Sequence, residues 1–144
     1  MSKSPIDRRT FLQRTASVLA IASFNRVPLH HHGMDPFSME HPDPRPGITA
    51  EHVLTTEKLG ASRKEKLLAS YDAARGNPEI FDGLACACGC TGKNGSHRSL
   101  LTCFETMQPT GCYGCQEEAL LVASLIKDGK SLGEIRATID KKWG

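Results

Sequence analysis

The chain has 144 residues, 39% of them hydrophobic, which allows one small folded domain with additional segments and no more. Its formal net charge of +2 is unevenly distributed, because five basic residues and a single acidic one fall within the first 26 positions. The remainder is slightly acidic, which argues against nucleic-acid binding, since that function needs a basic face to neutralise phosphates.

Residues 1–26 have the features of an export signal. In the segment DRRTFLQ an arginine pair precedes two hydrophobic residues, which resembles the twin-arginine signal. The apolar segment ASVLAIASF that follows is far shorter than the roughly 18 residues a spanning helix needs, and its AIA triplet fits a cleavage site. We therefore expect the twin-arginine machinery to export the protein to the bacterial periplasm or cell exterior, with no integral membrane segment after processing. A basic amphipathic helix is the alternative.

Residues 27–56 are rich in proline, histidine and methionine. They hold five of the eight prolines and five of the six histidines, and proline favours extended backbone. We expect a flexible linker here, followed by a cysteine-rich helical domain over residues 57–144. Imidazole suits Cu(II), Zn and Ni, and thioether suits Cu(I), so the tract is a candidate secondary metal site; an ordinary polar linker is the alternative. Its candidate ligands are His30, His31, His32, Met34, Met39 and His41.

The first helices of the domain are predicted from the residues that typically start and end a helix. The segment SRKE fits a capping box with Ser62 as the N-cap of a helix, and Gly76 ends that helix. Ser96 is expected to cap a later helix that carries Cys103. No run shows the strict alternation of a strand.

The last third of the chain predicts a helix hairpin. The first helix runs from about Tyr113 to Asp128 and Gly129 terminates it. The segment SLGE is a second capping box, which starts the next helix. Apolar residues recur three or four positions apart along that helix and define one buried face. They are Leu132, Ile135, Ile139 and Trp143.

Two acidic residues, Glu117 and Glu118, lie in the first turn of the longer helix. We expect them to be surface residues that complement the helix dipole rather than acid–base catalysts. The predicted fold class is therefore all-α, a small helical domain with a C-terminal helix hairpin and an irregular cysteine-rich loop.

All six cysteines fall between residues 86 and 115, together with one histidine. The run ACACGC places three thiols within five positions, and Gly89 allows a turn that makes them converge. The C-x-x-C pair opens a helix, where backbone N–H groups favour the thiolate. A thiolate is both a metal ligand and a nucleophile, so the pattern supports both chemistries. The candidate ligands are Cys86, Cys88, Cys90, His97, Cys103, Cys112 and Cys115.

Three more specific sites are excluded by the residues around these cysteines. Gln116 stands where c-type haem attachment requires histidine. No strands flank the C-x-x-C helix as a thioredoxin fold would need. The spacing also matches no common ferredoxin pattern.

The segment NPEIFDGLACACGC, followed by His97, the SLLTCF segment and the C-x-x-C pair, resembles the exported PCYCGC-motif family, also called the CYCXC (seleno)protein family. The likeness covers roughly residues 62–144. Ala85 stands where the family usually has proline, and Ala87 where it has tyrosine or another bulky residue. Because some members contain selenocysteine, the resemblance implies redox chemistry or selenolate ligation.

The C-terminal part is also similar to the cytochrome c maturation thiol reductases. The shared features are a C-x-x-C-Q segment and a following helix with a Gly-Lys-Ser…Glu-Ile pattern. This similarity implies disulfide exchange at Cys112 and Cys115.

Three functions fit the sequence. The first is an exported metal-binding protein with a soft thiolate site for a transition metal, with Cu(I) favoured and zinc as the alternative. The second is a thiol–disulfide redox protein in which Cys112 and Cys115 are the catalytic pair. The third is a structural domain stapled by three disulfides. No motif identifies a redox or metal-delivery partner.

Overall fold

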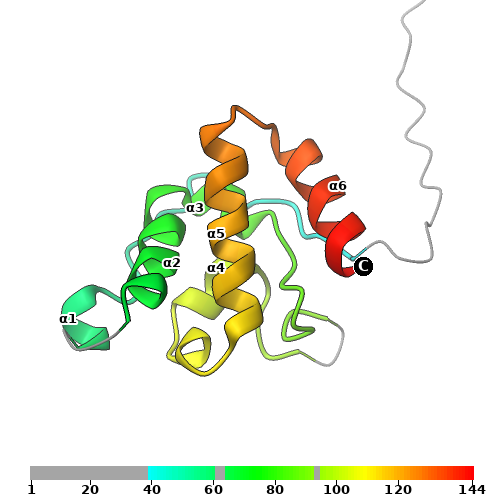
Figure 1. Ribbon diagram of the computed structural model, residues 1–144. Helices are drawn as coiled ribbons and strands as arrows, with labels where there is room; N and C mark the ends of the chain where they lie inside the picture. The colour runs from blue at the N-terminus through cyan, green and yellow to red at the C-terminus, as the bar shows by residue number, and fades with distance from the viewer. Residues whose placement is uncertain (1–38, 61–63, 93–94) are drawn as a thin grey trace, which may run out of the picture. The chain divides into compact units, whose positions relative to one another are not determined.

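Helices alone make up the regular structure of the part of the chain that is described. The computed structural model describes residues 39–60, 64–92 and 95–144, all within one compact unit, Met34–Gly144, and these ranges contain no strand. The predicted all-α class is confirmed (Figure 1). In order, the elements are α1 (Thr56–Leu59), α2 (Glu65–Gly76), α3 (Pro78–Asp82), α4 (Leu100–Phe104), the 3-10 helix η1 (Gln108–Thr110), α5 (Tyr113–Lys127) and α6 (Leu132–Trp143).

Helix α5 lies between α2 and α6 (Figure 1) and packs against both, as well as against η1. Three aromatic rings from α2, α3 and α4 form the centre of the core. Phe104 meets Tyr71 and Phe81 edge to face, with ring centroids 4.9 Å and 6.0 Å apart, an arrangement that aromatic pairs prefer. Cys103 and Cys115 belong to the same buried cluster, so two of the thiols are part of the hydrophobic core.

The predicted C-terminal hairpin is present. Helix α5 ends at Lys127, and Gly129 takes the left-handed backbone (φ 75°) that turns the chain. The side chain of Ser131 accepts from the N–H of Glu134, and the Glu134 carboxylate accepts from the N–H of Ser131, which completes the capping box. Ile135 and Ile139 are buried as expected, and Leu132 and Trp143 pack partly buried against the core.

Two predicted helix starts are wrong. Helix α2 has Lys64 as its N-cap instead of Ser62, which lies outside the described residues. Helix α4 is capped by Ser99 in a reciprocal capping box with Thr102. Ser96 is exposed and its hydroxyl contacts the ring of His97. The loop between α3 and α4 is therefore three residues longer than predicted, because α4 is capped at Ser99 and not at Ser96.

The N-terminal strap, residues 39–55, packs on the helices instead of forming a free linker. The N–H of Met39 donates to Oδ1 of Asp140 in α6 at 2.9 Å, and Nε2 of His41 contacts the same oxygen at 3.1 Å. Nδ1 of His41 accepts from the N–H of Ala85 at 2.9 Å. The prediction of a flexible linker over residues 27–56 is therefore wrong from residue 39 onward, while residues 1–38 lie outside the described ranges.

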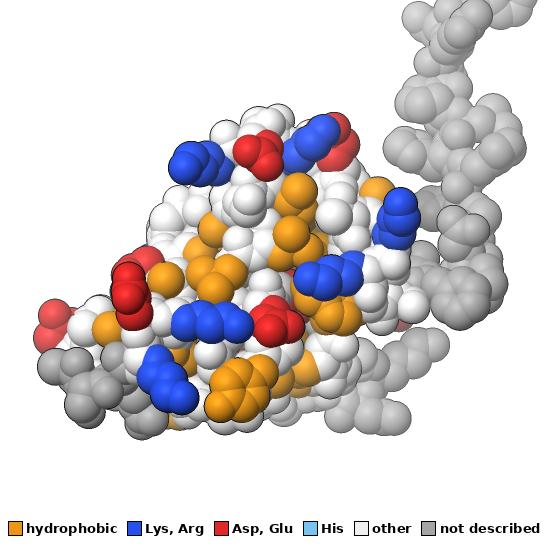
Figure 2. Space-filling view, in the orientation of Figure 1, with side chains coloured by type: hydrophobic (Ala, Val, Ile, Leu, Met, Phe, Trp, Pro, Cys, Tyr) orange, Lys and Arg blue, Asp and Glu red, His pale blue; other side chains and the backbone are white. Residues whose placement is uncertain are grey.

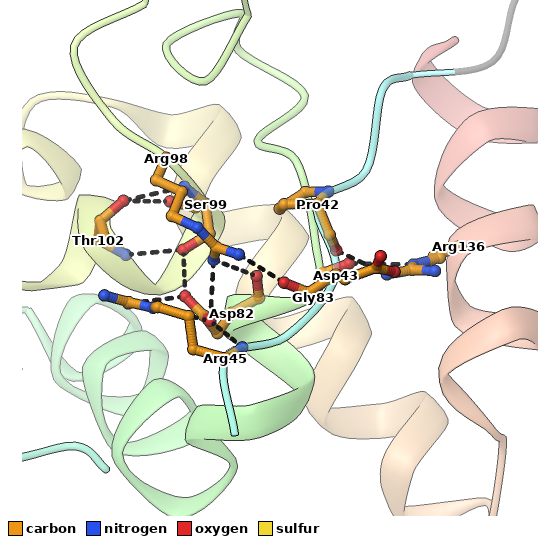
Figure 3. A network of polar contacts seen from close by, with 9 residues as sticks. All are labelled: Pro42, Asp43, Arg45, Asp82, Gly83, Arg98, Ser99, Thr102 and Arg136. Carbon is orange, nitrogen blue, oxygen red and sulfur yellow. Dashed lines mark hydrogen bonds and ion pairs between the residues drawn. The ribbon is translucent and has the colours of Figure 1, made fainter. Parts of the chain in front are cut away.

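A buried carboxylate, Asp82, joins the strap to α4 (Figure 3). It accepts from Nε and the terminal nitrogen of Arg45 at 3.1 Å and 2.8 Å, and from Oγ of Ser99 at 2.9 Å. Arg98 pairs with it at 2.9 Å. Burial alone would raise the pKa of Asp82, but the hydrogen bonds from Arg45 and Ser99 and the charge of Arg98 hold that pKa at about 2.

The Asp82 network fixes both ends of the cysteine loop, residues 83–98, because α3 precedes that loop and α4 follows it. Arg136 of α6 adds a third attachment, since it donates to the carbonyls of Gly83 and Pro42 at 3.0 Å and 2.7 Å (Figure 3). The loop is therefore anchored to the strap, to α6 and to α4.

The surface mixes charges of both signs. On the face in Figure 2, lysine, arginine and acidic side chains are interspersed with apolar ones. Tyr113, at the start of α5, is the most exposed large apolar residue of the described ranges, with 69% of its surface accessible. None of the described helices combines the length and apolar character needed to cross a bilayer.

Candidate functional site

Four thiols from two distant parts of the chain converge in one place. Cys86, Cys88 and Cys90 come from the cysteine loop, and Cys115 comes from the first turn of α5. The sulfur of Cys86 lies 3.2 Å from that of Cys88 and 3.4 Å from that of Cys115, and the last two are 3.6 Å apart. With Cys90 included, all four sulfurs lie within 4.8 Å of one another. We call this set the four-thiol group.

A second set, the Cys–His group, contains Cys90, His97 and Cys103. Its three ligand atoms also lie within 4.8 Å of one another, and the sulfurs of Cys90 and Cys103 are 3.0 Å apart. Cys90 belongs to both groups. The two sets are therefore adjacent and joined through one sulfur atom.

Backbone turns bring the loop cysteines together. Gly89 has a φ of 79°, and its N–H donates to the carbonyl of Cys86 at 3.0 Å. This turn, which the sequence predicted, prevents the alternation of side chains that an extended C-x-C-x-C run would show. The N–H of Cys86 donates to the hydroxyl of Thr91 at 2.8 Å, which closes the turn.

The loop then folds back so that His97 reaches Cys90. The N–H of His97 donates to the carbonyl of Cys90 at 3.1 Å. A Cβ on Gly95 would lie 2.1 Å from that carbonyl oxygen, so only glycine fits this close approach of two backbone segments.

Cys112 lies outside both groups, although the sequence placed it among the ligands. It is the N-cap of α5 and is half-buried. All six cysteines are free thiols in this structure, so the three-disulfide arrangement is not the one observed.

Glu118 is a site residue that the sequence analysis assigned to the surface, and that prediction is wrong. It is fully buried, and its Oε2 accepts from the N–H of Ala87, between Cys86 and Cys88, at 2.8 Å. Its Oε1 has no hydrogen-bond partner among the described residues. Burial raises the pKa of Glu118 to about 7, against the opposing hydrogen bond from Ala87. Glu117 is exposed, as predicted.

The spacing of residues along α5 could have predicted that Glu118 is buried. Cys115, Glu118, Ala119 and Val122 follow one another at intervals of three, one and three residues, which places all four on one face of α5. All four are buried. A glutamate three positions after Cys115 on this apolar face therefore lies on the side of the helix that faces the thiols.

Neutral thiols are favoured where they are crowded and buried. The pKa of Cys115 is raised by the nearby Cys103 and by burial, against the opposite effect of Cys86. For Cys86 the nearby Cys103 lowers the pKa, but contact with Cys115, burial and the nearby Glu118 outweigh it, and the pKa is raised. A bound cation reverses this balance, because metal ligation requires thiolates and releases their protons.

The donor set fits a soft metal ion. In a tetrahedral zinc site with Zn–S distances of about 2.3 Å, neighbouring sulfurs are about 3.8 Å apart. The sulfurs of the four-thiol group need move only slightly to reach that spacing. Cys86 and Cys115 are buried, whereas Cys88 is exposed and Cys90 is half-buried, so the group is closed toward the core and accessible from solvent.

The secondary tract is only partly described. His30, His31, His32 and Met34 lie outside the described residues. Met39 packs partly buried against the core, and both ring nitrogens of His41 have hydrogen-bond partners within the protein. Burial lowers the pKa of His41 despite the nearby Asp140. His41 therefore has a structural role here and offers no free nitrogen to a metal.

A comparison with protein-family models identifies a family for this chain. A family model described as "protein of unknown function with PCYCGC motif" matches residues 49–144, about two thirds of the chain. No curated protein and no solved structure matches.

Proposed function

The chain belongs to the family of proteins with a PCYCGC motif, and we propose that its four-thiol group holds a soft transition-metal ion in a protein exported from the bacterial cytoplasm. The observation that carries this proposal is the convergence of four sulfurs, from a loop and a helix 25 or more residues away, within 4.8 Å. Metal ligation requires thiolates, which would repel one another at these distances, and a bound cation would offset that repulsion.

Thiolate softness sets the class of metal. Cysteine ligands select Cu(I) and zinc over harder ions such as magnesium or calcium. We favour Cu(I), because the thiols and the imidazole of His97 together exceed the four ligands of one tetrahedral zinc site. Cys86, Cys88, Cys90 and Cys115 are the ligands of this first ion.

Export supports the same function. The segment DRRTFLQ resembles a twin-arginine signal, and that route carries proteins already folded. A site filled before export would be protected from the oxidising conditions outside the cytoplasm. The protein would then act in the periplasm or at the cell exterior.

The deciding experiment is elemental analysis combined with free-thiol counting on protein exported by its own host. We expect stoichiometric copper or zinc and no disulfide. Cys88→Ser should lose the metal while the fold is kept, because Cys88 is exposed, and Cys112→Ser should retain it as the matched control. Absence of any transition metal from wild-type protein with available thiols would reject the proposal.

A second candidate function is thiol–disulfide exchange by Cys112 and Cys115. It is favoured by the placement of this C-x-x-C pair at the start of α5, with Cys112 as the N-cap, and by the position of Cys112 outside both ligand groups. In this reaction the two thiols give two electrons and two protons to a partner's disulfide, which becomes two thiols, and Cys112 and Cys115 become a disulfide. A midpoint potential between roughly −120 and −270 mV supports this candidate, and a failure of both cysteines to exchange with glutathione excludes it.

A further inference from the structure

We infer that Cys90, His97 and Cys103 form a second metal site that shares Cys90 with the four-thiol group, so that one chain binds two Cu(I) ions. This inference rests on the proposed function, because the bridging thiolate belongs to the first site as well. It adds a second ion, a different ligand set and a different exposure to solvent.

The position of Cys90 is the first reason. Its sulfur lies within 4.8 Å of the other three sulfurs of the four-thiol group and within 4.8 Å of the ligand atoms of His97 and Cys103. A thiolate carries several lone pairs and can bind two soft ions at once. A single ion on the four-thiol side leaves Cys103, 3.0 Å from Cys90, without a ligand role.

The backbone of the loop is the second reason. Gly95 passes so close to the carbonyl of Cys90 that no side chain fits there, and the N–H of His97 donates to the same carbonyl. The imidazole is thereby held beside Cys90, although the two residues are seven positions apart in sequence. Ser96 Oγ lies 3.1 Å from Nδ1 of His97, and hydrogen bonding of one ring nitrogen is what orients a histidine ligand.

The two sites differ in their ligands and exposure. The Cys–His group offers three ligands, with Cys103 buried and both Cys90 and His97 half-buried. Two thiolates and one imidazole suffice for a three-coordinate Cu(I) site, whereas a tetrahedral zinc site would need a fourth ligand. We therefore assign the second site to Cu(I) and expect its ion to exchange more readily with small thiols or chelators than the ion held by four cysteines.

The test is an anaerobic titration of the reduced full-length protein with Cu(I), in competition with a chromophoric Cu(I) chelator. The wild type should bind two equivalents. His97→Ala should bind one, because His97 is half-buried and its removal leaves the four-thiol group intact. Cys112→Ser should bind two, since Cys112 belongs to neither site.

The outcomes separate the two proposals. One equivalent in the wild type, lost in Cys88→Ser and unchanged in His97→Ala, would overturn the second site and support the first. Two equivalents in His97→Ala with the wild-type affinity would also overturn it. No bound Cu(I) in the wild type would reject both. Circular dichroism of each variant verifies that a lost equivalent is not a lost fold, and Cys103→Ala should reproduce the result of His97→Ala.

Discussion

Oγ of Ser99 donates a hydrogen bond of 2.9 Å to Oδ1 of Asp82, and this single bond connects the N-cap of α4 to the last residue of α3. Both residues are fully buried. Since the cysteine loop lies between them, the bond fixes the distance that the loop must bridge. It thereby sets where Cys103, on α4, stands relative to Cys90 in the loop.

Stability should fall in acid because of Asp82. Its pKa is held at about 2 in the folded protein, below its ordinary value of 3.8. A group with a lowered pKa stabilises the folded state above its unfolded pKa, and this contribution is lost as the pH falls from about 4 to 2. The difference corresponds to about 2 kcal/mol. Urea unfolding at pH 6, 4, 3 and 2 measures it.

Asp82→Asn should flatten that acid limb and lower the free energy of unfolding at pH 6. Asp72→Asn is the matched control, because Asp72 is exposed and its ion pair is with Arg75, three positions along α2. An acid limb of the same size in Asp82→Asn and wild type would show that other carboxylates are responsible.

Glu118→Ala should be destabilising and should weaken metal binding. The substitution removes the acceptor of the Ala87 N–H in the middle of the C-x-C-x-C run. A buried donor without a partner costs about 1–3 kcal/mol, and a looser loop holds its ligands less well. Thermal unfolding and Cu(I) competition measure the two effects.

Glu117→Ala provides the comparison for Glu118, because Glu117 is adjacent but exposed and pairs with Lys66 at 3.4 Å. It should change stability by no more than about 0.5 kcal/mol. Equal effects of the two substitutions would contradict the structural role of Glu118.

Gly95→Ala should disturb the Cys–His group in particular. The new Cβ would lie 2.1 Å from the carbonyl oxygen of Cys90, so the backbone must move and His97 must move with it. We expect a lower melting temperature and weaker binding of the second Cu(I). Gly92→Ala, whose Cβ would meet nothing closer than 3.8 Å, is the control and should behave like wild type. Unchanged binding of both ions by Gly95→Ala would contradict this view of the loop.

His41→Ala should lower stability without changing the number of metal ions bound. It removes the acceptor of the Ala85 N–H and the contact with Asp140, and lost hydrogen bonds of this kind cost about 1–3 kcal/mol. The control is His52→Ala, because the side chain of His52 is 71% exposed. Thermal unfolding and metal stoichiometry are the measurements, and loss of a metal equivalent would mean that His41 is a ligand after all.

The helices whose stabilising contacts are local were predictable from sequence. The Ser131 cap and the apolar spacing of α6 involve residues at most four positions apart, and both were identified correctly. The end of α5 at Gly129 was equally local, because it depends on the backbone freedom of one residue. Such signals need no knowledge of the rest of the fold.

Contacts between residues far apart in the sequence could not be predicted from the sequence. Glu118 and Ala87 are 31 positions apart, and Met39 and Asp140 are 101 positions apart. No pattern in either segment names its partner, so Glu118 was assigned to the surface and the strap to a linker. Ser99 was overlooked as a cap because the extra loop length needed to bring His97 back to Cys90 is itself a tertiary requirement.

The cysteine pattern predicted the site but not its division. From their spacing, all six thiols and His97 were predicted to be candidate ligands of a single site. The division depends on which side of the loop each sulfur faces, and that is settled by the turn at Gly89 and the close approach at Gly95. The separation of Cys112 from the ligand groups likewise depends on where the first turn of α5 meets the loop.

The hydrogen bond between the strap and Ala85 gives a structural role to the alanine that this chain has in place of the proline of the family motif. The motif is named for a proline at the position of Ala85, and proline has no N–H to donate. The bond from the N–H of Ala85 to His41 is therefore available only to a chain that has no proline at this position. Where proline fixes the backbone of the loop by its own ring, this protein fixes it with a histidine from the strap. Positions 41 and 85 should accordingly vary together among relatives, with histidine at the first only where the second retains its N–H.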